Sequence, residues 1–204
     1  MSQLKIGISG CSGKMGKTLI KLISEHQECN ISGGLEAENN PDLGKNLGKL
    51  INSDNINAIV TSDRKLFFET CDIIIDFSTP DSTVENLKFG KKFGKGLVIG
   101  TTGLSQEIEK KIEIAAKDIP IVYSANMSIG INILMELTKK LSSILNNEDF
   151  DVEILEMHHK HKVDAPSGTA LALGKAVANG RNIDLFKHSE IVRDGINAKR
   201  KIGN

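Results

Sequence analysis

Short apolar runs alternate with helical patterns through the first 125 residues. Six runs rich in Ile, Val and Leu are predicted to be β-strands, at residues 4–9, 29–35, 57–60, 71–78, 96–102 and 119–125. Helices are predicted between them at residues 15–26, 64–70, 81–93 and 105–117. Several of the strands are apolar on both faces, so we expect an α/β fold with a doubly wound parallel sheet covered by helices. Residues 36–56, rich in Asn, Gly and Asp, are predicted to form a long surface loop.

The pattern changes after residue 126. Residues 128–145 carry apolar side chains along one stripe, which predicts a long amphipathic helix. A strand-like stretch at 149–159 and a helix at 169–180 are expected to follow. We therefore expect a Rossmann-type domain and a smaller α+β domain, with bounds at 1–126 and 127–204.

Composition is that of an ordinary globular protein, with 39% hydrophobic residues. Lys and Arg together number 26, as do Asp and Glu, so no excess charge favours nucleic acid or an anionic membrane as a partner. No apolar run approaches the about 20 residues that span a bilayer, and the chain starts directly in a predicted strand, so no signal peptide is expected. Three widely spaced cysteines favour a reducing cytoplasm over a disulfide framework.

A glycine-rich loop follows the first predicted strand and opens the first helix. Its sequence GISGCSGKMGKTLI places Gly10, Gly13 and Gly16 at regular spacing. These positions suit a tight turn, a close backbone approach to pyrophosphate, and close packing of the helix on the sheet. Glu36 ends the second predicted strand, 20 positions after Gly16, where a carboxylate can accept hydrogen bonds from an adenosine ribose. Together these features indicate a dinucleotide site.

The choice between NADH and NADPH depends on the same region. Glu36 favours NADH because a carboxylate repels the 2′-phosphate of NADPH, and Ala37 beside it offers no positive charge. Lys14, inside the glycine loop, is either a compensating charge or a solvated lysine of the first helical turn.

Three further segments follow predicted strands: DFSTPDST at 76–83, GTTG at 100–103 and SANMS at 124–128. Each by itself is typical of a turn or helix cap. Because ligands of open α/β sheets bind at the carboxyl ends of the strands, the three together indicate one groove.

A cationic cluster of three histidines and two lysines occupies residues 158–162. In an extended chain His158 and Lys160 share one face, and His159 and His161 the other. A metal site, a solvated surface, and an anion and proton-transfer site are all open, but no nearby Cys or Glu completes a metal set beyond Glu156. The following PSGT segment opens a helix whose N–H groups and hydroxyls suit a carboxylate, so we favour a small dianion as ligand.

The segment EMHHKHKVDAPSGTA, together with GCSGKMG, VIGTTG and SANMSIGIN in the same order, resembles the 4-hydroxy-tetrahydrodipicolinate (dihydrodipicolinate) reductase family over nearly the whole chain. The resemblance implies hydride transfer from NADH or NADPH to a cyclic dicarboxylate imine, with loss of the 4-hydroxyl as water. It also implies an enzyme of the diaminopimelate route to lysine. The cysteines, the balanced charge and the ligand count lead us to expect a cytoplasmic protein without a metal, a nucleic-acid partner or a membrane partner.

Site residues implied by the resemblance come from both domains. The catalytic pair is His158, as proton donor and acceptor, and Lys162, as proton donor. The substrate-binding positions that the resemblance implies are His159, Gly168 and Thr169, and we add Ser167 from the PSGT segment that opens the helix. We add Gly16 from the spacing of the glycine loop. The cofactor-binding positions that the resemblance implies are Gly10, Cys11, Ser12, Gly13, Lys14, Met15, Glu36, Gly100, Thr101, Thr102, Ser124, Ala125, Asn126 and Met127.

Two departures from the family pattern matter. Many relatives carry an arginine at the position of Ala37, which separates NADPH use from NADH use. Family members also continue beyond residue 204 through further strands of the second domain, and they are typically homotetramers assembled through that sheet. We therefore expect an incomplete second domain and lower stability than in a longer relative. A reductase of another imine or aldehyde and an inactive nucleotide-binding remnant are the alternative interpretations.

Overall fold

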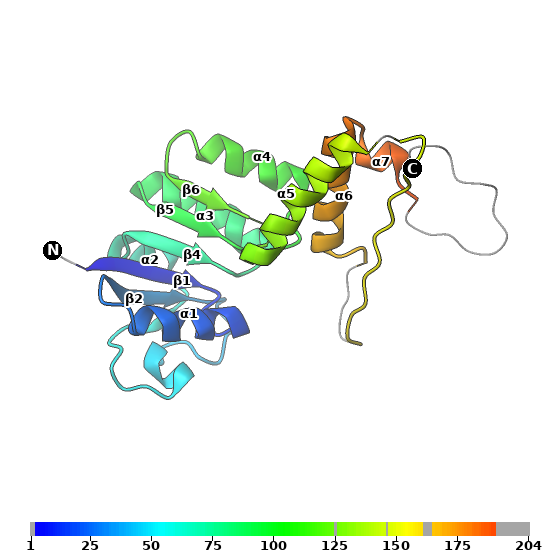
Figure 1. The fold of residues 1–204 in the computed structure, drawn as a ribbon. Helices are drawn as coiled ribbons and strands as arrows, with labels where there is room; N and C mark the ends of the chain where they lie inside the picture. Colours follow the sequence, from blue (N-terminus) through cyan, green and yellow to red (C-terminus); the bar gives the residue numbers. More distant parts are fainter. Residues whose placement is uncertain (1–2, 125, 146, 161–164, 191–204) are drawn as a thin grey trace. The chain divides into compact units, whose positions relative to one another are not determined.

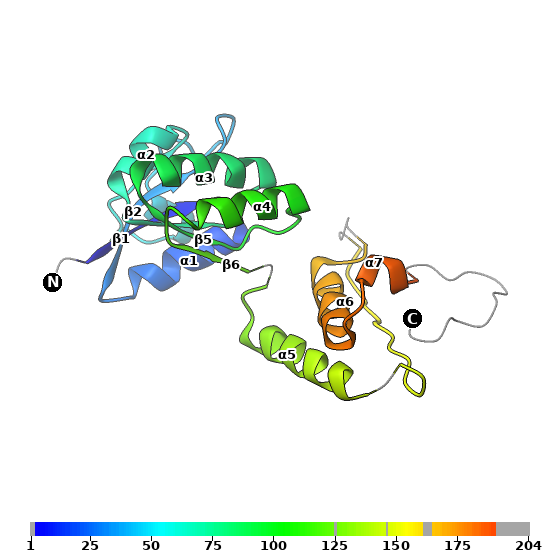
Figure 2. The same cartoon turned by 90° about the horizontal axis from the view of Figure 1, so that it is seen from above.

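The computed structural model describes residues 3–124, 126–145, 147–160 and 165–190. The chain divides into two compact units, Met1–Ser124 and Ala125–Asn204, and each is described by itself. Their elements are labelled in Figure 1 and seen from a second side in Figure 2.

The first unit is built on a six-stranded sheet in which every pairing is parallel. Its strands are β1 (Leu4–Ser9), β2 (Cys29–Leu35), β3 (Val60–Thr61), β4 (Ile73–Asp76), β5 (Gly96–Ile99) and β6 (Ile121–Tyr123). The spatial order is β3-β2-β1-β4-β5-β6, in which β1 lies between the two halves of the sheet. This is the order of a doubly wound dinucleotide-binding fold, so the predicted fold class is confirmed.

Helices cover both faces of this sheet. They are α1 (Lys14–Ser24), α2 (Arg64–Thr70), α3 (Pro80–Phe93) and α4 (Gln106–Ala115). One core cluster joins the strands to α2, α3 and α4 through Phe67, Leu87 and Ile112. A second cluster joins the other face to α1 through Ile20 and Ile23. Two separate cores on one sheet explain why the strands are apolar on both sides.

The ends of α3 show how local sequence sets the bounds of an element. The Thr79 side chain accepts a hydrogen bond from the Ser82 N–H, and Pro80 occupies the first turn. Pro is suited to this position because its missing N–H would have no partner inside the helix. At the other end, Gly94 takes a left-handed conformation with φ of 63° and terminates the helix.

The predicted loop at 36–56 is more ordered than its composition indicated. It contains a 3₁₀ helix, η1 (Leu47–Ile51), and the Leu47 side chain is fully buried in the core beside α1. The Asn46 side chain begins this helix by accepting a hydrogen bond from the Gly48 N–H. The prediction of a surface loop was therefore wrong for this part, because one apolar anchor and a polar cap outweigh the loop-like composition.

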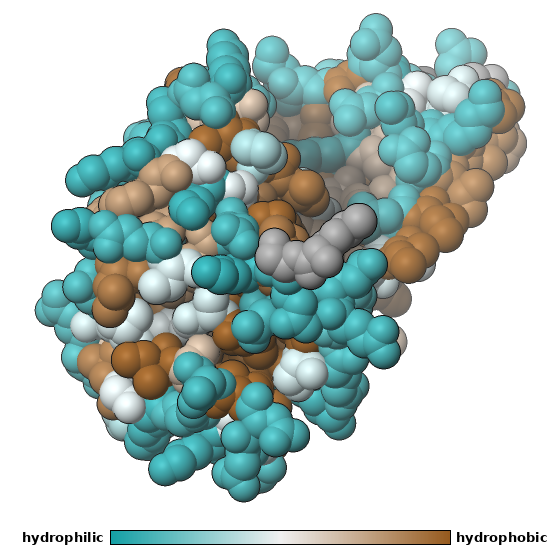
Figure 3. Space-filling view, turned by 90° about the vertical axis from the view of Figure 1, so that its left-hand side faces the viewer, coloured by the Kyte–Doolittle hydropathy of each residue, from teal (hydrophilic) through white to brown (hydrophobic). Residues whose placement is uncertain are grey.

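The described part of the second unit contains α5 (Ile129–Ile144), α6 (Gly168–Arg181) and α7 (Leu185–His188). Helices α5 and α6 approach closely near Gly180, where an added Cβ would lie 2.4 Å from the Lys139 carbonyl oxygen. The apolar stripe predicted for α5 is present, but its large side chains at 129, 133, 134, 137, 141 and 144 are exposed in the single chain. Apolar side chains also reach the surface among hydrophilic ones on the face drawn in Figure 3.

The strand-like stretch at 149–159 forms no strand in the described structure. It is an irregular segment, drawn as a yellow tube in Figure 1, and Leu155 and Met157 on it are more than four-fifths exposed. The strand prediction is therefore wrong for these residues. A strand needs a neighbouring strand to pair its N–H and C=O groups, and the part of the second unit that the structure describes contains helices and loops only. None of the described helices is long and apolar enough to cross a membrane.

Candidate functional site

The glycine loop runs from the end of β1 to the start of α1 and is tightly packed. Gly10 has φ of 80°, and a Cβ there would lie 2.3 Å from the Phe77 carbonyl oxygen. A Cβ on Gly16 would lie 2.3 Å from the Gly10 carbonyl oxygen, so helix and loop are in backbone contact. The Gly10 N–H donates to the Leu35 carbonyl oxygen at 3.0 Å. The predicted roles of Gly10 and Gly16 in the turn and in close packing therefore have a geometric basis.

The N-terminus of α1 differs from those of the other helices. Its cap residue is Gly13, and no side chain accepts a hydrogen bond from its first turn. All other described α-helices are capped by a side-chain oxygen, from Asp63, Thr79, Ser105, Ser128, Ser167 and Asp184. The N–H groups at the start of α1, where Lys14 and Met15 are exposed, are suited to an anionic ligand such as pyrophosphate.

Glu36 lies beside this loop, as the ribose-binding hypothesis requires. Its Oε1 accepts a hydrogen bond from the Ser12 N–H at 2.7 Å. Its Oε2 has no hydrogen-bond partner within the described residues and the side chain is half-buried. One oxygen thus fixes the carboxylate against the loop while the other remains an acceptor for a ligand hydroxyl.

Cys11 contributes packing at this position. The side chain is fully buried, and burial, followed by the negative charge of Glu36, raises the pKa of its thiol to about 12. The thiol is therefore protonated at neutral pH and unreactive. The residue as a whole is buried beneath the loop, so the structure shows a packing role for Cys11, and its contact with a cofactor stays a prediction.

A buried polar network that sequence reasoning missed lies at the end of β4. The Asp76 carboxylate is fully buried and accepts hydrogen bonds from Thr83 Oγ1 at 2.9 Å and Asn86 Nδ2 at 3.0 Å. The Ser78 hydroxyl and backbone N–H also donate to it. The carboxylate thereby fixes the turn between β4 and α3.

Asn86 extends this network to a second strand and a second helix. Its Nδ2 also donates to Ser9 Oγ at the end of β1, at 3.0 Å, and its Oδ1 accepts a hydrogen bond from Arg64 of α2. The carboxyl ends of β1 and β4 are therefore joined through side chains. The sequence showed Asp76 only as the first residue of a polar segment after a strand.

The segment after β5 is joined to the same network. The buried Thr101 hydroxyl accepts a hydrogen bond from the Ser78 N–H at 3.1 Å, and Gly100 donates its N–H to the Asp76 carbonyl oxygen at 2.9 Å. Thr102, the next residue, is exposed. The Ser124 N–H donates to the Ile99 carbonyl oxygen at 3.2 Å. These contacts bring two of the predicted strand-end segments, 76–83 and 100–103, together at one edge of the sheet.

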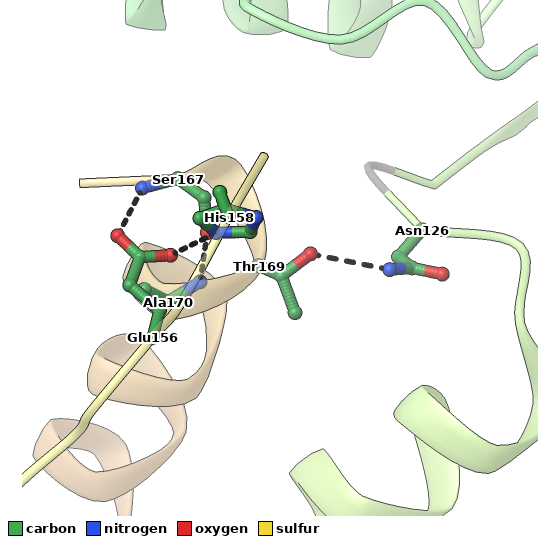
Figure 4. Close-up of polar contacts among 6 residues, drawn as sticks. All are labelled: Asn126, Glu156, His158, Ser167, Thr169 and Ala170. Atoms are coloured by element: carbon green, nitrogen blue, oxygen red, sulfur yellow. Dashed lines mark hydrogen bonds and ion pairs between the residues drawn. The ribbon is translucent and has the colours of Figure 1, made fainter. Parts of the chain in front are cut away.

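In the second unit one carboxylate joins the cationic segment to the start of α6 (Figure 4). Glu156 Oε2 lies 2.9 Å from His158 Nε2, and Glu156 Oε1 accepts a hydrogen bond from the Ser167 N–H at 2.9 Å. Hydrogen bonds from the Ser167 side chain and from His158 lower the pKa of the Glu156 carboxyl to about 2. Glu156 is therefore ionised at neutral pH and holds both partners.

The predicted substrate-binding residues of α6 are at its first turn. Ser167 Oγ caps the helix by accepting a hydrogen bond from the Ala170 N–H at 3.1 Å, and the residue is buried. Gly168 is exposed, with open space where a Cβ would be. Thr169 Oγ1 accepts a hydrogen bond from Asn126 Nδ2 at 3.3 Å, as Figure 4 shows. A predicted substrate-binding residue and a predicted cofactor-binding residue are thus in direct contact.

Other predicted site residues are exposed or lie outside the described structure. His159, Lys160 and Met127 are exposed. Lys162 and Ala125 lie outside the described residues, as does His161. Where side chains are described, no three of the His, Cys, Asp and Glu groups come together in a way that would hold a metal ion.

Glu156 is the functional candidate of this unit that the sequence did not single out. From the sequence, Glu156 could be recognised only as the carboxylate nearest the histidines. The available signal was that Glu156 lies two positions before His158. Whether two side chains at this spacing meet depends on the path of the backbone, and the predicted strand gave the wrong path for this segment.

Comparisons with known proteins agree along the chain. Residues 4–127 match the family described as dihydrodipicolinate reductase, N-terminus, and residues 130–203 match its C-terminal counterpart. A 4-hydroxy-tetrahydrodipicolinate reductase of Chelativorans sp. is 43% identical over 100% of this chain and 73% of its own length. The enzyme of that name from Rhizobium meliloti is 41% identical over 100% of this chain and 84% of its own.

A solved structure gives the same result for the fold. The dipicolinate-bound dihydrodipicolinate reductase of Paenisporosarcina sp. TG-14 aligns with a TM-score of 0.68 and 27% identity, over 88% of this chain and 67% of that one. Both family halves match in order, and the identities extend over the whole sequence. The chain therefore belongs to the dihydrodipicolinate reductase family.

Proposed function

We propose that this protein catalyses the NAD(P)H-dependent reduction of 4-hydroxy-tetrahydrodipicolinate to tetrahydrodipicolinate, in the diaminopimelate route to lysine. One NAD(P)H and a proton are consumed for each substrate, and NAD(P)⁺ and water are released. In this proposal the first unit binds the dinucleotide and the second binds the substrate. The observation that carries it is the placement of His158 beside the α6 N-terminus, in a chain that shares the family sequence along its whole length.

The first unit fits a dinucleotide. Gly10 and Gly16 are at positions that a Cβ would obstruct, the first turn of α1 has no side-chain cap, and Glu36 Oε2 is available beside it. The first turn of α1 would hold the pyrophosphate and Glu36 the adenosine ribose. NAD(P)H bound there supplies the hydride for the reduction.

We further propose that NADH is the preferred cofactor. Ala37 is exposed next to Glu36, so no cation at that position balances a 2′-phosphate. Besides burial, the charges of Glu36 and, more weakly, of Asp42 raise the pKa of the Cys11 thiol, so both carboxylates lie close to the glycine loop. Lys45 lies 2.7 Å from Asp42 and is paired with that carboxylate. NADPH carries the additional negative charge of its 2′-phosphate, so Coulomb repulsion from Glu36 disfavours it relative to NADH.

The second unit supplies groups for a dicarboxylate and for a proton. Gly168 and Thr169 present the N–H groups at the start of α6, and His159 follows His158 on the cationic segment. A helix N-terminus and neighbouring cations both stabilise carboxylates. In this proposal His158 is the proton donor and acceptor and Lys162 is the proton donor.

The test is an assay with the purified chain, enzymatically generated substrate, and NADH or NADPH, followed at the nicotinamide absorbance band. We expect substrate-dependent oxidation, a higher kcat/KM with NADH, and at least about a 100-fold lower rate for His158→Ala, because proton transfer by a positioned side chain contributes about 10²–10⁴.

The matched control is His26→Ala, an exposed histidine beyond the end of α1, which should leave the rate unchanged. An absence of oxidation while NADH still binds, measured by its fluorescence, would contradict the proposed activity. Equal rates for His158→Ala and the wild type would contradict the role of His158.

We also propose a cytoplasmic location. All three cysteines are free thiols, as expected for a protein in a reducing compartment.

A further inference from the structure

Glu156 makes two directed hydrogen bonds with one carboxylate. Its Oε2 bonds with the imidazole Nε2 of His158, and its Oε1 with the N–H of Ser167 (Figure 4). The Glu156 side chain is 27% exposed and that of His158 39%, so the pair lies at the surface of the substrate unit, where a ligand can reach the imidazole.

We propose that Glu156 is a positioning residue that fixes the tautomer of His158 and, through the same carboxylate, joins this histidine to the substrate-binding start of α6. The inference rests on the proposed function and deepens it, because it states how the proposed proton-transfer group is prepared.

The tautomer follows from the chemistry of the two partners. An ionised carboxylate has no proton to donate, so the contact at 2.9 Å requires the hydrogen on His158 Nε2. In the neutral imidazole the other nitrogen, Nδ1, is then the acceptor. His158 Nδ1 has no hydrogen-bond partner within the described residues and is therefore the atom that faces solvent or substrate as a base.

The second hydrogen bond fixes the distance between the histidine and α6. Ser167 is buried, its hydroxyl accepts from the Ala170 N–H, and its own N–H is satisfied by Glu156. Gly168 and Thr169 follow immediately in the same turn. A change in the position of Glu156 therefore moves the proposed base and the proposed carboxylate-binding turn together.

Glu156→Gln tests the tautomer because the replacement has the same shape but different hydrogen-bond chemistry. The Ser167 N–H must still donate to an oxygen, so the amide oxygen takes that position and the amide NH₂ points at His158 Nε2. A donor facing Nε2 requires that nitrogen to be the acceptor, so the proton moves to Nδ1. The wild type should show the Nε2-protonated form in the ¹⁵N NMR spectrum and Glu156→Gln the Nδ1-protonated form, with His158→Ala used to assign the signal.

Kinetics provide the second measurement. We expect Glu156→Gln to lower kcat by at least about tenfold, which is less than the about 10²–10⁴ of a whole proton-transfer group because His158 itself remains, while the KM for NADH changes less than twofold. The control is Glu113→Gln, an exposed glutamate of α4 in the first unit, which should leave both the tautomer and kcat unchanged.

The same tautomer in wild type and Glu156→Gln would overturn the proposal, and so would an unchanged kcat. The NMR result does not depend on turnover. A wild-type chain without reductase activity would therefore contradict the proposed function, and the NMR spectra would still show whether Glu156 sets the tautomer of His158.

Discussion

The two units each contain a carboxylate that organises a polar turn, but the surroundings of the two acids differ. Asp76 in the first unit is fully buried and receives its hydrogen bonds from Ser78, Thr83 and Asn86 of the same fold. Glu156 in the second unit is partly exposed, and one of its two partners is a histidine whose side chain is 39% exposed. The buried acid is satisfied by its own fold and stabilises a turn, whereas the partly exposed acid contacts the histidine that we propose as the proton-transfer group.

The largest expected effect is on the buried acid. Asp76→Ala removes the acceptor for several buried donors, and we expect the free energy of unfolding to fall by about 3–5 kcal/mol, as for the loss of one partner in a buried charged network. Chemical denaturation of the chain measures this change. Asp81→Ala, an exposed acid in the first turn of α3, is the control and should cost less than about 1 kcal/mol. Equal costs for the two variants would show that the buried network does not stabilise the unit.

A smaller effect is expected at the glycine loop, where Gly10 can be compared with Gly44, a glycine of similar φ in another segment. Gly10 has φ of 80° and Gly44 of 78°, but only Gly10 is closed in by backbone, at the Phe77 carbonyl oxygen. Gly44→Ala should cost about 1–2 kcal/mol for its conformation alone. Gly10→Ala should cost more and should also weaken NADH binding, measured by fluorescence. Equal losses of stability with unchanged NADH binding would show that the close approach has no role.

The smallest effect concerns pH and the exposed acid. Because the pKa of Glu156 is lowered from 4.5 to about 2 in the folded chain, its ionised form stabilises the loop at pH values above 4.5. This contribution is lost as the pH falls from 4.5 toward 2. Hydrogen exchange at the Ser167 N–H should therefore become faster over that interval, after correction for the intrinsic exchange rate. In Glu156→Gln the same amide should show no such pH dependence, and a matching dependence there would point to another group.

The sheet of the first unit was predictable because each strand and helix has its own local signal. Apolar runs marked the strands, and α2 was predicted with the bounds that are observed, Arg64–Thr70. The strands end earlier than the apolar runs: β4 ends at Asp76 and β5 at Ile99. The residues that follow these strands form the turns of the Asp76 network instead of pairing in the sheet. The pattern of apolar and polar side chains does not show where pairing stops.

The second unit was less predictable because its polar contacts depend on the path of the chain. The period of the segment at 149–159 indicated a strand, yet pairing requires a partner that a local pattern does not contain. The link between Glu156 and Ser167 joins residues eleven positions apart, a separation that no local pattern of side chains indicates. For the same reason Asn86, 77 positions from Ser9, could not be placed beside it from sequence. Glu36 was placed correctly beside the glycine loop because strand order alone brings it there.

Phe77 lies between two glycines that belong to different loops. Its carbonyl oxygen occupies the space where a side chain at Gly10 would begin, and its ring occupies that space at Gly100. A mutation at either glycine would thus displace the same residue, and no single exchange at 77 would make room at both. A smaller side chain at residue 77 would open space at Gly100 but would leave the carbonyl oxygen against Gly10, so Gly10 has the stricter requirement for glycine.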